Sequence, residues 1–112
     1  MALFSATIMI HVREPHEIPS VSDSISDRLV AKGYRKKAET RSWKVMAGKR
    51  VLIKMKAVLG MPRQALADVS AASMYRSGIL VRVEAAEPEE LVEAVNALIE
   101  ATRGYPSELE SA

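Results

Sequence analysis

The sequence contains no cysteine, which excludes disulfide bonds, thiolate zinc sites and cysteine nucleophiles. No run of apolar residues approaches the roughly twenty that a helix needs to cross a bilayer. The first four residues also lack the positive charge that opens a secretory signal peptide. These absences predict a soluble, cytoplasmic protein without a membrane partner.

Side-chain amides are also scarce, because Gln64 and Asn96 are the only two. With the absence of cysteine, this resembles the composition of thermophile proteins, which avoid heat-labile residues. We therefore expect a thermophilic source, although the six methionines point the other way. A compositional bias toward Ala, Val and Arg is the alternative explanation.

Motifs of the common enzymes are missing as well. There is no P-loop, no dinucleotide-binding fingerprint and no nucleophile paired with a base, so we expect no catalysis and no cofactor. His11 and His16 lie near Glu14 and Glu17, but their spacing fits no zinc template. We predict that these four residues are solvated loop residues and that the chain has no metal site.

The length of 112 residues and the 48% apolar content are typical of one compact domain with a real core. We place this domain at residues 1–104. Gly104 and Pro106 stop the last helical pattern, and residues 105–112 are expected to form a flexible tail.

Alternation of apolar and polar residues over residues 5–12 predicts a first strand. Ser20, three residues before Asp23, offers a capping box for a helix that presents Val21, Ile25 and Leu29 on one stripe. Gly33 is expected to end that helix.

The pattern of residues 40–57 predicts a β-hairpin with Gly48-Lys49 as a two-residue turn. One face of this hairpin is expected to be apolar and to join the core, with Met46, Val51 and Ile53. The register that follows for the other face pairs Ala47 with Arg50, Val45 with Leu52, Trp43 with Lys54 and Arg41 with Lys56.

Residues 62–75 permit a helix, although an extended segment is also possible. A strand over residues 79–85 and an amphipathic helix from Pro88 follow. The fold class is therefore α+β, with an antiparallel sheet and helices on one face. A ferredoxin-like βαββαβ order with an added C-terminal helix ranks first, and βαβββα is the alternative.

Charge is strongly segregated along the chain. Residues 28–63 hold twelve of the sixteen Lys and Arg and only one acid, Glu39, whereas residues 84–112 hold eight Glu and only Arg103 as a cation. A local field of one sign attracts a partner of the opposite sign, even when the net charge is only +2. This pattern predicts a polyanionic partner for the basic segment.

The leading hypothesis is a non-catalytic nucleic-acid-binding protein whose basic hairpin grips single-stranded DNA or RNA. Cations would neutralise phosphates, and Trp43 would stack on a base. Aromatic residues make up only 4% of the chain and no RNP strand or GXXG loop is present, so we expect contacts mainly to the backbone. The predicted site residues are Tyr34, Arg35, Lys36, Lys37, Arg41, Trp43, Lys44, Lys49, Arg50, Lys54 and Lys56. Of these, Lys44 points toward the other face in the predicted register.

The alternative hypothesis is a structural subunit that forms a homo-oligomer through its open sheet face or its C-terminal helix. In that case Trp43, Val45 and Leu52 would be buried between subunits, and the surrounding cations would pair with Glu residues of a neighbour. Charge reversal at Lys54 and Lys56 separates the two hypotheses, because only the second predicts a change in assembly.

Overall fold

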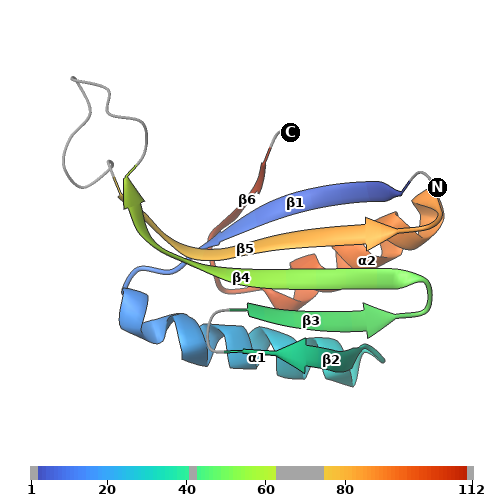
Figure 1. The fold of residues 1–112 in the computed structure, drawn as a ribbon, viewed down its shortest axis with the longest axis horizontal. Coiled ribbons are helices and arrows are strands. Elements are labelled where there is room, and N and C mark those ends of the chain that lie inside the picture. The colour runs from blue at the N-terminus through green and yellow to red at the C-terminus, as the bar shows by residue number, and fades with distance from the viewer. Residues whose placement is uncertain (1–2, 41–42, 63–74, 111–112) are drawn as a thin grey trace.

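The computed structural model describes residues 3–40, 43–62 and 75–110 (Figure 1). No helix in these ranges is both long enough and apolar enough to cross a membrane. The elements are, in chain order, β1 (Phe4–His11), a 3-10 turn η1 (Pro15–Glu17), α1 (Ile18–Ala31), β2 (Arg35–Glu39), β3 (Trp43–Gly48), β4 (Val51–Pro62), β5 (Tyr75–Ala85), α2 (Pro88–Ala101) and β6 (Ser107–Glu110).

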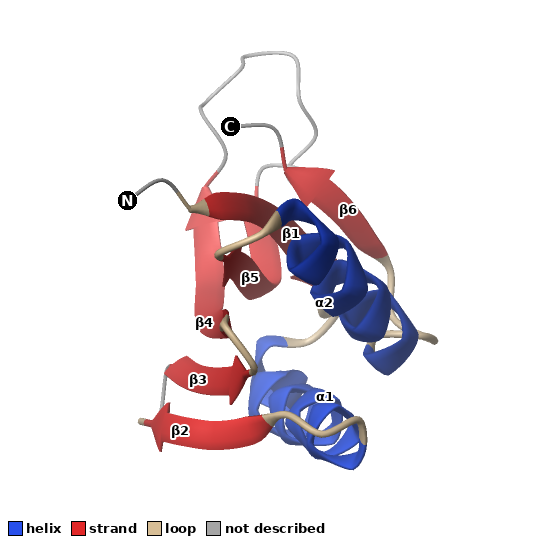
Figure 2. Ribbon diagram, turned by 90° about the vertical axis from the view of Figure 1, so that its right-hand side faces the viewer, coloured by secondary structure: helices blue, strands red, loops and turns tan. Residues whose placement is uncertain are grey.

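The strands form one antiparallel sheet of six strands in the order β2-β3-β4-β5-β1-β6. Both helices pack on the same face of this sheet (Figure 2). The predicted α+β class, with an antiparallel sheet and helices on one face, is confirmed. One sheet face is therefore closed by helices, and the other, which we call the open face, carries no helix in the described part of the chain.

The strand order differs from the ferredoxin-like order that the sequence favoured. β4 and β5 are direct antiparallel neighbours, and β5 in turn pairs with β1. The sequence permitted a helix over residues 62–75. In the structure, Pro62 is the last residue of β4 and Tyr75 is the first residue of β5, and residues 63–74 lie outside the described residues. The alternative βαβββα order is contained in the observed one, with β2 and β6 added.

β6 occupies part of the segment that the sequence places in a flexible tail. Ser107–Glu110 pair with β1, and the His11 amide donates to the Pro106 carbonyl at 2.8 Å. The sequence pattern is too short to reveal such a strand, because it forms only where β1 offers an unpaired edge.

Helix α1 forms because apolar residues recur every three or four positions and all face the sheet. Ile18, Val21, Ile25 and Leu29 are buried. The helix begins at Ile18, two residues before the expected cap at Ser20, and no side chain caps it, so the predicted capping box is wrong. It ends before Gly33, whose φ of +104° suits glycine.

The hairpin between β3 and β4 turns at Lys49-Arg50 instead of Gly48-Lys49, and Gly48 pairs with Val51 as the last residue of β3. Arg50 takes the positive φ of the turn, at +61°. Glycine is needed at position 48 for another reason, because a Cβ there would lie 2.6 Å from Cε1 of Tyr34. The predicted register is thus wrong by two residues, which leaves the strand residues Trp43, Val45, Leu52, Lys54 and Lys56 on their predicted face. Arg50, which was predicted to lie opposite Ala47 on that face, lies in the turn instead.

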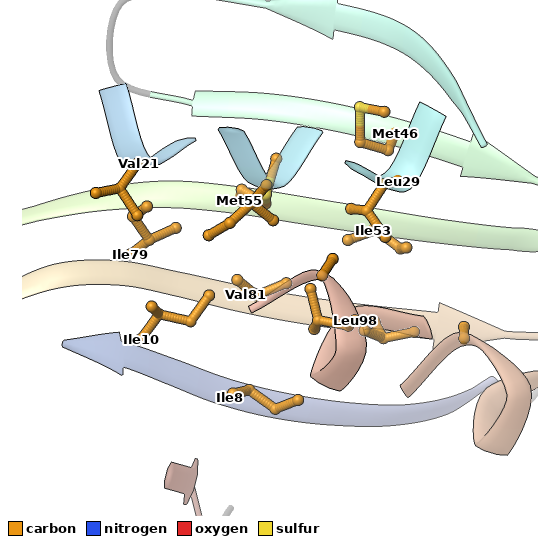
Figure 3. Close-up of a cluster of buried hydrophobic side chains, with 14 of the residues drawn as sticks. Ile8, Ile10, Val21, Leu29, Met46, Ile53, Met55, Ile79, Val81 and Leu98 are labelled. Carbon is orange, nitrogen blue, oxygen red and sulfur yellow. The ribbon is translucent and has the colours of Figure 1, made fainter. Parts of the chain in front are cut away.

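The core lies between the closed face and the helices. Met46, Ile53 and Met55 from the hairpin meet Leu29 of α1 and Leu98 of α2, and each of these side chains is 2% exposed or less. Figure 3 shows this cluster with the side chains of β1 and β5 that complete it. Because strand residues alternate between faces, the burial of this set fixes which residues reach the open face.

Candidate nucleic-acid interface

The open face carries the side chains that alternate with the core residues of β2 to β5. Strand register places Trp43 opposite Lys56 and Val45 opposite Lys54, and the next strand adds Leu80 and Arg82 beside these lysines. The face as a whole combines cations with half-buried apolar side chains, and its residues on these strands include Arg35, Trp43, Val45, Leu52, Lys54, Lys56, Leu80, Arg82 and Glu84.

Glu84 lies within this cationic group and partly neutralises it. Lys54 Nζ lies 2.8 Å from Glu84 Oε1, and Arg82 Nε lies 3.1 Å from Glu84 Oε2. The hydrogen bond from Lys54 holds the pKa of Glu84 below its ordinary value. Lys56, by contrast, is exposed and has no ion-pair partner among the described residues. Lys56 is therefore available to a polyanion.

Trp43 is the first residue of β3 and is 40% exposed. Its position opposite Lys56 brings an aromatic surface and an exposed ammonium group together on the open face. This pairing of an indole with a cation suits a nucleic-acid strand, because the ring can stack on a base while the cation contacts a phosphate.

Lys44 lies on the closed face, as the alternation of β3 predicts, and the structure separates it from the other predicted site residues. It is 7% exposed and its ammonium group bonds to the Asp23 carboxylate. Lys44 Nζ also donates to Ser26 Oγ at 3.4 Å and lies 3.8 Å from Glu39 Oε2. The hydrogen bond from Lys44 lowers the pKa of Asp23. Lys44 thus joins β3 to α1 and is not available to an external ligand.

The other predicted site residues are spread over β2 and the hairpin turn. Arg35 lies on the open face and Lys37 is exposed at the β2 bulge, whereas Lys36 faces the other way, 3.5 Å from Glu39. Arg41 lies outside the described residues.

Lys49 and Arg50 form the turn, at the opposite end of β3 from Trp43. Arg50 contacts Glu87 at 3.4 Å and Glu90 at 3.7 Å, near the start of α2. Tyr34 is half-buried beside Gly48, and this burial raises the pKa of its hydroxyl. Tyr34 therefore supports the hairpin, and Lys49 is the freest cation at the turn.

Sequence reasoning missed Arg82 and Glu84 as parts of the site. Their alternation with buried Val81 and Val83 was visible, but nothing in the sequence shows that β5 lies next to β4. Sequence reasoning also missed a cavity of about 600 Å³ between the start of α1 and the adjoining parts of β3, β4 and β5.

The cavity is mainly apolar, with Ile18, Met55 and Ile79 among its lining residues, and Trp43 also contributes to it. Within the described ranges, no three His, Asp or Glu side chains gather as they would around a metal ion. No known protein family, curated protein or solved structure matches this chain.

Proposed function

We propose that this chain is a non-catalytic nucleic-acid-binding protein that holds single-stranded RNA or DNA across its open face. The observation that carries the proposal is the pairing of exposed Trp43 with Lys56 on the open face. Among the residues that the structure describes, Lys56 has no ion-pair partner and no helix covers this face. Lys54, Arg82 and Arg35 extend the positive surface on either side. Most of the binding free energy then comes from phosphate contacts and counterion release, with little sequence preference.

The test is the affinity for fluorescent single-stranded RNA, single-stranded DNA and duplex at two salt concentrations. Wild-type protein should prefer the single strands and lose affinity steeply as salt rises. The double variant Lys54→Glu/Lys56→Glu should bind at least tenfold more weakly and lose about two units of the logarithmic salt slope, one for each lost phosphate contact.

The matched control is Lys32→Glu/Arg103→Glu, which makes the same change in net charge on the helical side of the sheet. This control should retain most of the affinity if the open face is the binding surface. Equal losses in both double variants would indicate a nonspecific effect of net charge. Equal, weak binding of all three nucleic acids by the wild type would contradict the proposal.

Self-association through α2 is the second candidate function. Val92 is 60% exposed and Ile99 is 54% exposed, and their spacing of seven residues places them on one side of the helix. If α2 forms an interface, the double variant Val92→Lys/Ile99→Lys should lower the mass measured by light scattering. Charge reversal at Lys54 and Lys56 would change that mass only if the subunits associated through the open face, so with an interface on α2 it should leave the mass unchanged.

A further inference from the structure

The sheet ends in two unpaired edges. β2 forms one edge and β6 forms the other, and no further strand pairs with either of them in the described part of the chain. Figure 1 shows the two strands on opposite sides of the sheet. All five residues of β2 are exposed, so no described segment covers that edge. Each edge strand presents backbone N–H and C=O groups that can pair with a further strand.

The two edges carry opposite charge. β2 has Arg35, Lys36 and Lys37 against one acid, Glu39, which gives the strand a net charge of +2. β6 has the sequence SELE, with two glutamates and no cation, which gives a net charge of −2. Like charges opposite each other destabilise a strand pair, whereas opposite charges stabilise it. Pairing of β2 with β2 or of β6 with β6 is therefore disfavoured, and pairing of β2 with β6 is favoured.

The directions of the strands also suit a pair of β2 with β6. Every neighbouring pair in the sheet is antiparallel, so strand direction alternates across the six strands, and β2 and β6 run in opposite directions. A second copy that is shifted along the sheet, without being turned over, brings its β2 beside β6 of the first copy as an antiparallel pair. The helices of both copies then lie on the same side, and their open faces adjoin.

We propose that the chain associates head to tail, with β2 of one copy pairing with β6 of the next in a continuous antiparallel sheet. Backbone hydrogen bonds join the copies by strand addition, and the charges of the two edges select the partner strand. A free β2 and a free β6 remain at the ends of the assembly. The contact therefore builds chains, or rings where the rotation between copies closes. This association requires neither nucleic acid nor the exposed apolar residues of α2.

The mass of the protein in solution tests the association. In light scattering without nucleic acid, the mass should rise above that of one chain as the protein concentration increases. At a fixed concentration the mass should fall as salt rises, because salt screens the attraction between exposed charges. The mass of one chain at every concentration would overturn the proposal.

Charge reversal at the two edges gives the sharpest test. Arg35→Glu/Lys37→Glu makes β2 acidic, and Glu108→Lys/Glu110→Lys makes β6 basic. Each variant alone should bind its own copies on the order of tenfold more weakly than the wild type does, because like charges then meet at the edges. An equimolar mixture should associate again, since the acidic β2 of one variant meets the basic β6 of the other. Two variants that are folded by circular dichroism but do not associate when mixed would overturn the proposal.

The matched control is Lys54→Glu/Lys56→Glu, which makes the same change in net charge as the β2 variant. Both lysines lie on β4, away from either edge, so this variant should associate as the wild type does. Equal losses in the control and in the β2 variant would show an effect of net charge alone and overturn the edge pairing. Loss of association in Val92→Lys/Ile99→Lys, with the edge variants unaffected, would place the interface on α2 and also overturn it.

A cross-link identifies the strands that meet, and it decides the question if an edge variant fails to fold. The chain has no cysteine, so single replacements supply unique thiols. Ala38→Cys lies near the end of β2 and Ser107→Cys at the start of β6, and antiparallel pairing brings these exposed positions close together. Under mild oxidation, a mixture of the two variants should form mainly the mixed disulfide. A predominance of links between two copies of the Ala38→Cys variant would show that β2 pairs with itself and overturn the proposal.

Discussion

Lys44 and Lys56 lie on neighbouring strands of one sheet, yet they meet opposite surroundings. Lys44 points into the closed face, where Asp23 and Glu39 surround its ammonium group. Lys56 points to the open face, where it is exposed and no described residue forms an ion pair with it. The comparison shows that the number of cations in a segment overstates the number that a ligand can reach.

The two faces also differ in how they use apolar side chains. Ile53 on the closed face is fully buried, whereas its neighbour Leu52 on the open face is only half-buried. The closed face gains its stability from burial of apolar area. The open face keeps partly exposed apolar side chains among its cations.

The largest expected effect comes from a test of this difference in burial. Ile53→Ala should lower the free energy of unfolding by about 2–5 kcal/mol, because it removes fully buried atoms and leaves a cavity. Leu52→Ala, its neighbour on the other face, should cost about 1 kcal/mol or less. Urea denaturation measures both. Equal losses would show that the open face is covered in solution, for example by a second copy of the chain.

The next effect concerns the buried ammonium group of Lys44. Asp23→Ala should lower the free energy of unfolding by about 1 kcal/mol, because Lys44 loses its nearest partner while Glu39 stays 3.8 Å away and water screens the exposed carboxylate. Asp27→Ala on the same helix is the control, since Asp27 is exposed and has no ion-pair partner among the described residues. A comparable loss in the control would show that the ion pair contributes nothing specific.

The ion pair between Lys44 and Asp23 also predicts that the free energy of unfolding depends on pH. The folded state lowers the pKa of Asp23, so its stabilising contribution is present above the unfolded value of 3.8 and is lost as pH falls through the lower folded value. The difference between wild type and Asp23→Ala should therefore shrink below pH 3.8. Thermal unfolding across this range measures it, and a difference that grows on acidification would contradict this assignment.

The smallest expected effect is on nucleic-acid affinity and concerns the charges of the open face. Glu84→Gln should strengthen nucleic-acid binding several-fold at low salt, because it releases Lys54 and Arg82 from their shared carboxylate. Glu89→Gln makes the same charge change on exposed α2 and should have little effect. Fluorescence anisotropy measures the affinities. Weaker binding by Glu84→Gln would mean that Glu84 holds the lysine and arginine in a binding geometry.

Much of the fold could be predicted from local patterns. Alternation assigned the faces of β1, β3, β4 and β5 correctly, and the 3.6-residue period identified α1 and α2. These signals are strong because burial of one face requires a repeating apolar pattern. The hairpin register could not be derived in the same way, since Gly48 is required by contact with Tyr34 and not by the turn.

The candidate site was only partly accessible to sequence reasoning. Trp43, Lys54 and Lys56 were placed together correctly, because they alternate with core residues of the same hairpin. Arg82 and Glu84 belong to β5, which is separated from β4 in the sequence by residues 63–74. No local sequence pattern shows that β5 pairs with β4. The partners of Lys44 lie on α1 and β2, so its burial also depends on packing between elements distant in sequence.

The sequence by itself determined the segregation of charge, the strand and helix periods, and the faces of the hairpin residues that lie within β3 and β4. The tertiary structure decided the strand order, the pairing of β6 with β1, the neutralisation of Lys44 by Asp23, and the cavity beside Trp43. The physical reason is the range of the interactions. Periodicity reflects burial within one element, whereas neighbours, ion pairs and cavities arise only when elements far apart in the chain pack together.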